Sequence, residues 1–248
     1  MLILTCVSKI VLGKLNEIYT RMSKATNKLY ITAFLLAAVL GQTFFEKEII
    51  LDASSSYHYL HSSDSFQLGG KSESTLQING KQIILNCTIK ESDYLWPFCN
   101  VTFQFYSQDE TGIGNGIKFN DYEYIAIKAR YAQTTDIGFR LQLRSFDPAY
   151  AEKDSFESWK FMGIEYWPGL NDEIKVPLNT LQVPNRWRMQ NKVSPDHSAP
   201  DFNNIMVLEL ATGTGIPVGN YRVHIDEIRL VGKYLSNEAT YGFIVFAL

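Results

Sequence analysis

Apolar and polar residues alternate with a period of two through most of the chain. In segment 139–144 the odd-numbered residues are apolar and the even-numbered ones are polar, the pattern of a half-buried β-strand. Segment 125–131 alternates in the same way, and segments 161–167 and 173–178 are further expected strands. Segment 205–210 is apolar on both faces, which indicates a strand in the middle of a sheet.

Two local patterns predict how strands pair. Asn79-Gly80 separates the strand-like runs 75–78 and 82–85, and an Asn-Gly pair in this position is a strong hairpin signal. In segment 221–231 the apolar phase slips at Asp226-Glu227, as a β-bulge would produce. Short helical signals are confined to residues 1–28, at the start of the chain, and to residues 179–183. Many short strands with turn residues between them predict an all-β fold, an antiparallel β-sandwich.

Two uncharged apolar runs flank this polar region, at 29–45 and 241–248. A spanning helix needs about 20 apolar residues, so the second run supplies less than half of one. We expect a transmembrane or signal-anchor helix at 29–45 and the start of a second transmembrane segment at 239–248. Residues 46–235 then form one extramembrane β-sandwich domain that senses or binds a ligand.

Residues 1–28 form a basic leader, which by the positive-inside rule stays in the cytoplasm while the domain is exported. A start at Met22 would leave a compact signal segment, so residues 1–21 can also be an over-extended start. A cleaved signal peptide and a soluble exported protein remain the alternative. The charged residues of the leader are five bases and one acid: Lys9, Lys14, Arg21, Lys24, Lys28 and Glu17.

Composition and charge narrow the choice of partners. A hydrophobic content of 46% argues against a disordered chain. The formal net charge of -3 and the lack of a basic stripe argue against nucleic acid as a partner.

Two of the three cysteines suggest a disulfide. Cys87 and Cys99 each share the apolar face of a predicted strand. If those strands form a hairpin across loop 90–98, both thiols meet on the core side. An exported domain lies in an oxidising compartment, where such a pair forms a disulfide. Two buried free thiols are the alternative.

Candidate binding residues come from two side-chain types. Aromatic side chains, Trp159 and Trp167 first among them, can stack on sugar rings, although most tryptophans of a sandwich fill its core. Trp96 and Trp187, with Tyr150 and Tyr166, belong to the same set of candidates. Arg140 and Arg144 lie on the polar face of segment 139–144, where they can bind an anionic ligand bidentately or simply face solvent.

No catalytic or metal-binding motif is evident. The glycines of 112–116 lack the Lys-Ser/Thr of a P-loop, and no nucleophile elbow occurs. His58 and His61 are spaced like metal ligands but precede a serine-rich stretch that indicates a solvated loop. Carboxylate pairs such as Asp226-Glu227 point apart on a strand. We expect no cofactor and no metal, and whether the chain is an enzyme stays open.

Three stretches of the sequence stand out together. They are Leu-Arg-Ser-Phe-Asp-Pro-Ala-Tyr at 143–150 with Trp-Lys-Phe-Met-Gly-Ile-Glu-Tyr at 159–166, Val-Leu-Glu-Leu-Ala-Thr-Gly-Thr-Gly at 207–215, and Tyr-Arg-Val-His-Ile-Asp-Glu-Ile-Arg-Leu-Val-Gly-Lys-Tyr at 221–234. In that order they resemble the periplasmic sensor region of bacterial membrane-bound diguanylate cyclases with a GGDEF output domain. The segment Leu-Trp-Pro-Phe-Cys at 95–99 also fits the layout of those sensor regions.

The resemblance implies a galactose-binding-type jelly roll, followed by a second span and then the cyclase. This sequence contains no GGDEF signature, so no catalytic residue carries over, and the chain looks like such a cyclase truncated before its catalytic domain. The resemblance implies a periplasmic sensor in the bacterial inner membrane that recognises a small molecule or sugar.

A ligand would signal through two arrangements of the sandwich or of a homodimer. The alternative function is an exported carbohydrate-binding β-sandwich module. A glycoside-active enzyme is a weaker third hypothesis, because no carboxylate pair is suitably placed.

Overall fold

The computed structural model describes residues 26, 28–30, 32–33, 46–67, 69–109, 112–134, 136–168 and 173–233. Residues 26, 28–30 and 32–33 are helical. The rest of the expected span at 29–45, nearly all of the leader and the apolar segment 239–248 lie outside the described residues. Within the described parts of the chain, no helix is long and apolar enough to cross a membrane. The chain divides into two units, and residues 47–232 form the larger one.

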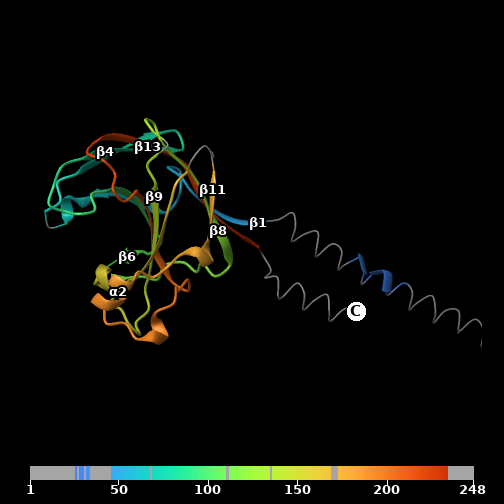
Figure 1. The fold of residues 1–248 in the computed structure, drawn as a ribbon. Coiled ribbons are helices and arrows are strands. Elements are labelled where there is room, and N and C mark those ends of the chain that lie inside the picture. Colours follow the sequence, from blue (N-terminus) through green and yellow to red (C-terminus); the bar gives the residue numbers. More distant parts are fainter. Residues whose placement is uncertain are drawn as a thin grey trace, which may run out of the picture. The chain divides into compact units, whose positions relative to one another are not determined.

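The larger unit is built on two antiparallel sheets that pack face to face (Figure 1). In the first sheet the strand order is β11-β8-β13-β4-β3, and β1 also pairs with β13. Its strands are β1 (Glu46–Leu51), β3 (Glu73–Asn79), β4 (Gln82–Ile89), β8 (Tyr122–Tyr131), β11 (Ile174–Pro177) and β13 (Gly219–Lys233).

The second sheet has the strand order β10-β9-β12-β5-β2. Its strands are β2 (His58–Ser63), β5 (Cys99–Gln104), β9 (Phe139–Ser145), β10 (Lys160–Tyr166) and β12 (Ile205–Thr212). A two-residue pair, β6 (Gln108–Asp109) and β7 (Gly112–Ile113), lies apart from both sheets. Among the described residues of this larger unit, the remaining elements are one short helix and four 3-10 helices: α2 (Asn185–Gln190), η1 (Asp64–Phe66), η2 (Phe156–Ser158), η3 (Leu178–Thr180) and η4 (Pro195–His197).

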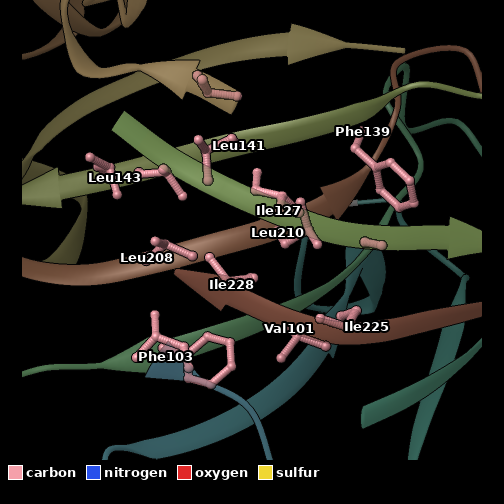
Figure 2. Packing of buried hydrophobic residues seen from close by; sticks show 14 of the residues in the cluster. Val101, Phe103, Ile127, Phe139, Leu141, Leu143, Leu208, Leu210, Ile225 and Ile228 are labelled. Atoms are coloured by element: carbon pink, nitrogen blue, oxygen red, sulfur yellow. The ribbon is translucent and has the colours of Figure 1, made fainter. Parts of the chain in front are cut away.

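The core lies between the two sheets and is formed by the alternating apolar residues of both. Phe139, Leu141 and Leu143 of β9 are at most 1% exposed. Figure 2 shows them facing side chains of the first sheet, among them Ile127 of β8 and Ile228 of β13. Alternation places every second side chain on one face of a strand, so the apolar pattern selects the face that is buried.

The structure confirms an all-β antiparallel sandwich of two sheets, and it confirms the local pairing signals. β3 and β4 form the expected hairpin, and Gly80 at its turn has a φ of 60°, which glycine adopts without steric cost. In β13 the register with β8 shifts between Ile225 and Glu227, where the bulge was predicted. β12 is buried on both faces and lies in the middle of its sheet.

Three local predictions were wrong. β4 and β5 are not a hairpin, because loop 90–98 carries the chain from the first sheet to the second. Residues 58–63 are the edge strand β2 rather than a loop, since their backbone pairs with β5. The helix expected at 179–183 is replaced by η3 and, after Pro184, by α2, because proline cannot continue a helix but is well suited to precede one.

The structure joins Cys87 and Cys99 by a disulfide, with their Cα atoms 5.9 Å apart. Both side chains point into the core from strands of opposite sheets. The bridge therefore ties the two layers together instead of closing the mouth of a hairpin.

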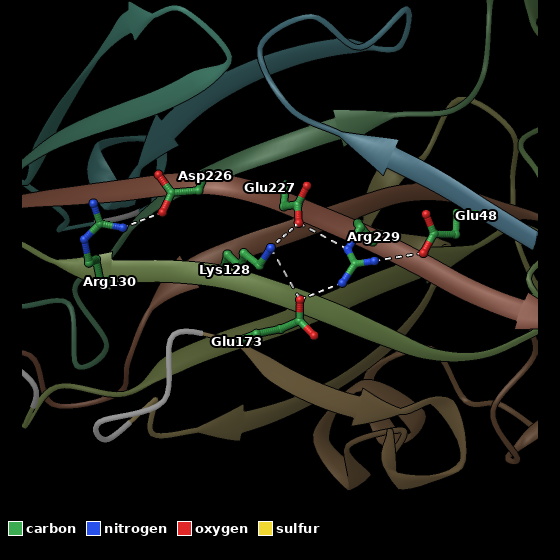
Figure 3. A network of polar contacts seen from close by, with 7 residues as sticks. All are labelled: Glu48, Lys128, Arg130, Glu173, Asp226, Glu227 and Arg229. Carbon is green, nitrogen blue, oxygen red and sulfur yellow. Dashed lines mark hydrogen bonds and ion pairs between the residues drawn. The ribbon is translucent and has the colours of Figure 1, made fainter. Parts of the chain in front are cut away.

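The outer face of the first sheet carries a network of ion pairs (Figure 3). Arg229 of β13 contacts Glu173 at 2.6 Å and Glu48 of β1 at 2.8 Å, and Lys128 of β8 contacts Glu227 at 2.7 Å. Lys128 also lies 3.7 Å from Glu173. These charges are therefore paired with one another across four strands or strand ends of the sheet.

Candidate functional site

The outer face of the second sheet is hollowed into a pocket of about 560 Å³. Its floor is formed by the polar-face residues of β9, which are Arg140, Gln142 and Arg144, with Glu209 and Ala211 of β12 beside them. The register explains the arrangement, because Gln142 is directly opposite Glu209 and Arg140 is directly opposite Ala211. The strand alternation that buries Leu141 and Leu143 thus presents these groups on the outer surface.

One wall of the pocket is the loop that joins β4 to β5, which contributes Tyr94, Trp96 and Phe98. The Tyr94 ring packs edge-on against the rings of Trp96 and Phe98, with centroid distances of 6.2 and 6.5 Å. Leu95 and Trp96 are exposed, so the loop presents aromatic surface to solvent. We call Tyr94, Trp96 and Phe98 the aromatic loop.

A buried carboxylate holds the end of the aromatic loop in place. Asp64 of η1 is fully buried and accepts hydrogen bonds from the backbone N–H and the hydroxyl of Ser72, at 2.7 and 2.8 Å. It also accepts one from the Phe98 N–H at 3.2 Å, and its own N–H donates to the Phe98 carbonyl at 3.1 Å. This bonding fixes the backbone of Phe98 at the edge of the pocket.

The other wall is the segment 184–191, which includes α2. Trp187 anchors it, because its indole is 6% exposed and its Nε1–H donates to the Glu157 carbonyl at 3.2 Å. The exposed Arg186 reaches over the Trp96 ring, with its guanidinium carbon 4.9 Å from the ring centroid. The two walls are therefore in contact through this pair.

Each arginine of the pocket lies against an aromatic ring. The guanidinium carbon of Arg140 is 5.6 Å from the centre of the Phe98 ring. That of Arg144 is 4.2 Å from the Phe156 ring and 5.0 Å from the Phe161 ring. Such contacts are attractive and keep the planar cation in a defined orientation.

Burial shapes the electrostatics of the two floor arginines. Arg144 donates from Nε to Glu209 at 3.4 Å, and the Glu209 side chain is only 7% exposed. Arg140 donates from Nε to the Thr212 carbonyl at 2.8 Å. Burial lowers the pKa of Arg140 from its ordinary value, while nearby Glu165 acts in the opposite direction. The polar face of β9 is therefore partly buried rather than simply solvated.

The four side chains predicted from the sequence to bind a ligand lie in different parts of the structure. Arg140 and Arg144 both line the pocket. Trp159 does not, because it is 1% exposed and packs in a small second core with Met206 and Val207. Its Nε1–H donates to the Glu152 carbonyl at 3.1 Å, so a ligand cannot reach its indole. Trp167 is 61% exposed but is not part of the pocket lining, and its role stays a prediction.

Sequence reasoning passed over most of the aromatic lining. Trp96 and Trp187 belonged to the wider set of aromatic candidates, behind Trp159 and Trp167, while Tyr94, Phe98 and Phe161 were not singled out. A usable signal was present, since Tyr94, Trp96 and Phe98 fall within five residues of one loop, and aromatic residues in a loop are less often needed for the core. Within the described residues, no cluster of His, Cys, Asp and Glu could hold a metal ion.

Comparison with known proteins yields similarities of structure only. No family model and no curated protein matches the chain. The resemblance to cyclase sensor regions and to galactose-binding-type jelly rolls therefore stays a prediction.

Among solved structures, one similar to this chain is the family 11 carbohydrate-binding module from Clostridium thermocellum in complex with a β-1,3-1,4-mixed-linked tetrasaccharide. It has a TM-score of 0.49 and 12% identity, over 76% of this chain and 96% of that one. A family 30 carbohydrate-binding module has a TM-score of 0.38 and 12% identity, over 70% and 99%. The native family 12 xyloglucanase from Bacillus licheniformis has a TM-score of 0.39 and 8% identity, over 74% and 100%. These likenesses assign no ligand to this chain.

Proposed function

We propose that this protein is a carbohydrate-binding module whose pocket on the second sheet binds an oligosaccharide. The observation that carries the proposal is the combination of an aromatic wall with a polar floor. A sugar ring presents C–H groups on its faces and hydroxyl groups around its edge. The aromatic loop suits the faces, and Gln142, Glu209 and the arginines suit the hydroxyl groups.

The dimensions of the pocket agree with this ligand class. A volume of about 560 Å³ lies within the usual range for small-ligand sites, about 300–1,000 Å³. The mixture of ring faces and convergent polar groups is typical of sites that fix a ligand's orientation by a few hydrogen bonds. The floor is built on strands and the loop is tied down at Phe98, so little ordering is required on binding.

The experiment is a binding screen of the full chain against immobilised polysaccharides and an oligosaccharide array, followed by titration calorimetry. We expect Trp96→Ala to weaken binding by about 2 kcal/mol or more, roughly thirtyfold, since a central tryptophan commonly dominates a binding site. Trp167→Ala is the matched control, because it also removes an exposed indole but lies outside the pocket. Absence of any oligosaccharide binding, or equal affinity of the Trp96→Ala variant and the wild type, would contradict the proposal.

A membrane-anchored sensor is a second candidate, favoured by the way the chain enters and leaves the sandwich. β1 and β13 are paired, and Glu48 near the start contacts Arg229 near the end at 2.8 Å. Neighbouring entry and exit strands suit a domain that is held at both ends. In this hypothesis the sugar site is the input of a signalling protein, as in a diguanylate cyclase.

Reporter fusions test that second candidate. With alkaline phosphatase fused after Ser236, an exported domain gives phosphatase activity, and a cytoplasm-only reporter at the same position stays silent. The opposite pattern would refute the orientation. The coding DNA beyond codon 248 tests the output: a second span followed by a GGDEF domain would support a cyclase, and an immediate stop would favour the stand-alone module.

A further inference from the structure

The pocket carries more cationic than anionic side chains. Arg140, Arg144 and Arg186 line it, against the two carboxylates Glu157 and Glu209. Glu209 is already paired with Arg144. Within the part of the chain that the structure describes, neither Arg140 nor Arg186 forms an ion pair with a carboxylate. Two positive charges in this pocket therefore lack a paired anion.

Arg140 is the more informative of the two, because it is partly buried. Its Nε–H is satisfied by the Thr212 carbonyl, and one face of its guanidinium lies against Phe98. Its terminal nitrogens form no hydrogen bond to any other described residue, so they remain as donors for a ligand. A cation that leaves water loses solvation unless an anion or acceptor replaces it. Among the described residues, Arg140 has one hydrogen-bond acceptor, the Thr212 carbonyl, and Glu165 and Glu209 act on it only from a distance, without an ion pair.

The outer face of the opposite sheet shows that this arrangement is not general. There Lys128, Arg130 and Arg229 each contact one or more carboxylates. Arg188 and Arg222 also form no ion pair with a described carboxylate, but Asn185 and Asn86 accept hydrogen bonds from them. Arg140 and Arg186 differ because they line the pocket, beside the rings that would receive a sugar. In the pocket, we expect the ligand to supply the missing partners.

We infer that the pocket selects acidic saccharides, in which an oxyanion on a sugar ring is bound by Arg140 and Arg186 while the aromatic loop contacts the ring. This inference rests on the proposed carbohydrate-binding function. A uronate carboxylate matches the forked donors of a guanidinium, and a sulfate ester offers the same chemistry. Arg144 is occupied by Glu209 and contributes hydrogen bonds to hydroxyl groups instead.

The test uses matched oligosaccharides with the full, disulfide-bonded chain. A neutral oligosaccharide is compared by calorimetry with the same oligomer oxidised to carboxylates at C6 and with its sulfated form. We expect at least one acidic form to bind about tenfold or more tightly than the neutral one, as charge-assisted hydrogen bonds do. That preference should diminish at high salt, because part of it is electrostatic.

Three variants separate local from overall charge effects. Arg140→Gln and Arg186→Gln should each reduce the ratio of acidic to neutral affinity by about fivefold or more. Arg186 is exposed on α2, so its substitution stays informative if Arg140→Gln fails to fold. Arg130→Gln is the control, since it makes the same change in net charge on the opposite sheet and should leave the preference intact.

The outcomes distinguish this inference from the function on which it rests. If neutral oligosaccharides bind as tightly as both acidic forms, the inference is overturned and the carbohydrate-binding function stands. If Arg130→Gln reduces the preference as much as Arg140→Gln does, the effect comes from net charge and the assignment to the pocket arginines is also overturned. If no saccharide binds, both proposals fall.

Discussion

Replacing Asp64 by asparagine tests how the aromatic loop is held. In the wild type, one carboxylate oxygen of Asp64 accepts from the Ser72 N–H, and the other accepts from the Ser72 hydroxyl and from the Phe98 N–H. Asparagine has nearly the same shape but only one acceptor oxygen. If that oxygen keeps the Ser72 N–H, the new amide NH2 faces the Phe98 N–H, and two donors oppose each other.

The expected cost follows from those contacts. Hydrogen bonds to a charged acceptor contribute about 1.5–3 kcal/mol, and a buried donor left unsatisfied costs about 1–3 kcal/mol. We therefore expect Asp64→Asn to lower the free energy of unfolding by about 3 kcal/mol or more. For a domain of this size that corresponds to a fall in melting temperature of roughly 6–12 °C. Binding should weaken as well, because Phe98 is no longer fixed at the edge of the pocket.

Asp52→Asn is the matched control. Asp52 is 5% exposed, but a single carboxylate oxygen accepts both of its side-chain hydrogen bonds, from the N–H and the hydroxyl of Ser54 at 2.8 and 2.7 Å. An asparagine can keep that oxygen in place, so we expect a loss below about 1 kcal/mol. Urea denaturation in oxidising buffer, followed by tryptophan fluorescence, measures both variants.

If the two variants unfold at the same urea concentration, the proposed role of Asp64 is wrong. Likewise, if Asp64→Asn is destabilised but binds saccharide with wild-type affinity, Phe98 does not need this anchor.

Three further outcomes follow from the sandwich. Leu141→Ala should lower the free energy of unfolding by about 2–5 kcal/mol through the cavity it leaves, and Arg144→Ala should lower it by about 1–3 kcal/mol because Glu209 would be left buried without its partner. Thermal melts measure both losses. If Leu141→Ala had no effect, the face of β9 that we assign to the core would be wrong. Mass spectrometry after alkylation of the unfolded, unreduced protein should leave Cys87 and Cys99 unlabelled, and reduction should cost about 2–4 kcal/mol; two freely alkylated thiols would show that the bridge is absent. The purified chain should make no cyclic dinucleotide from GTP, since it carries no GGDEF signature, and turnover above a mock preparation would contradict this.

The sheets were predictable because alternation is a local property. In β9, in β12 and at the bulge in β13, the order of a few neighbouring apolar and polar residues is enough to predict which faces of the strand are buried. The shared apolar phase of Cys87 and Cys99 likewise predicts that both point into the core. The alternation of apolar residues along a strand does not specify, however, the sheet to which that strand belongs. The two cysteine strands were therefore assigned to one hairpin although they lie in opposite layers.

The pocket was less predictable because it is assembled from distant segments. Gln142 and Glu209 are neighbours only through the β9–β12 register, which the sequence does not specify. The burial of a single tryptophan follows no period, so Trp159 could not be distinguished from Trp96 by pattern. Loop position was the better guide, since the aromatic loop has no strand partner that would bury it.

The disulfide has a consequence for how this protein can diversify. Cys87 and Cys99 are 12 residues apart, so the bridge closes a covalent ring that contains Tyr94, Trp96 and Phe98. Both ends of the ring are fixed to the sandwich, one in each sheet, whatever side chains lie between them. Substitutions at the exposed positions of the ring, such as Leu95, leave the framework untouched and alter only the surface offered to a ligand. Randomising those positions would therefore produce a library of binders on one scaffold, in the manner of an antibody loop.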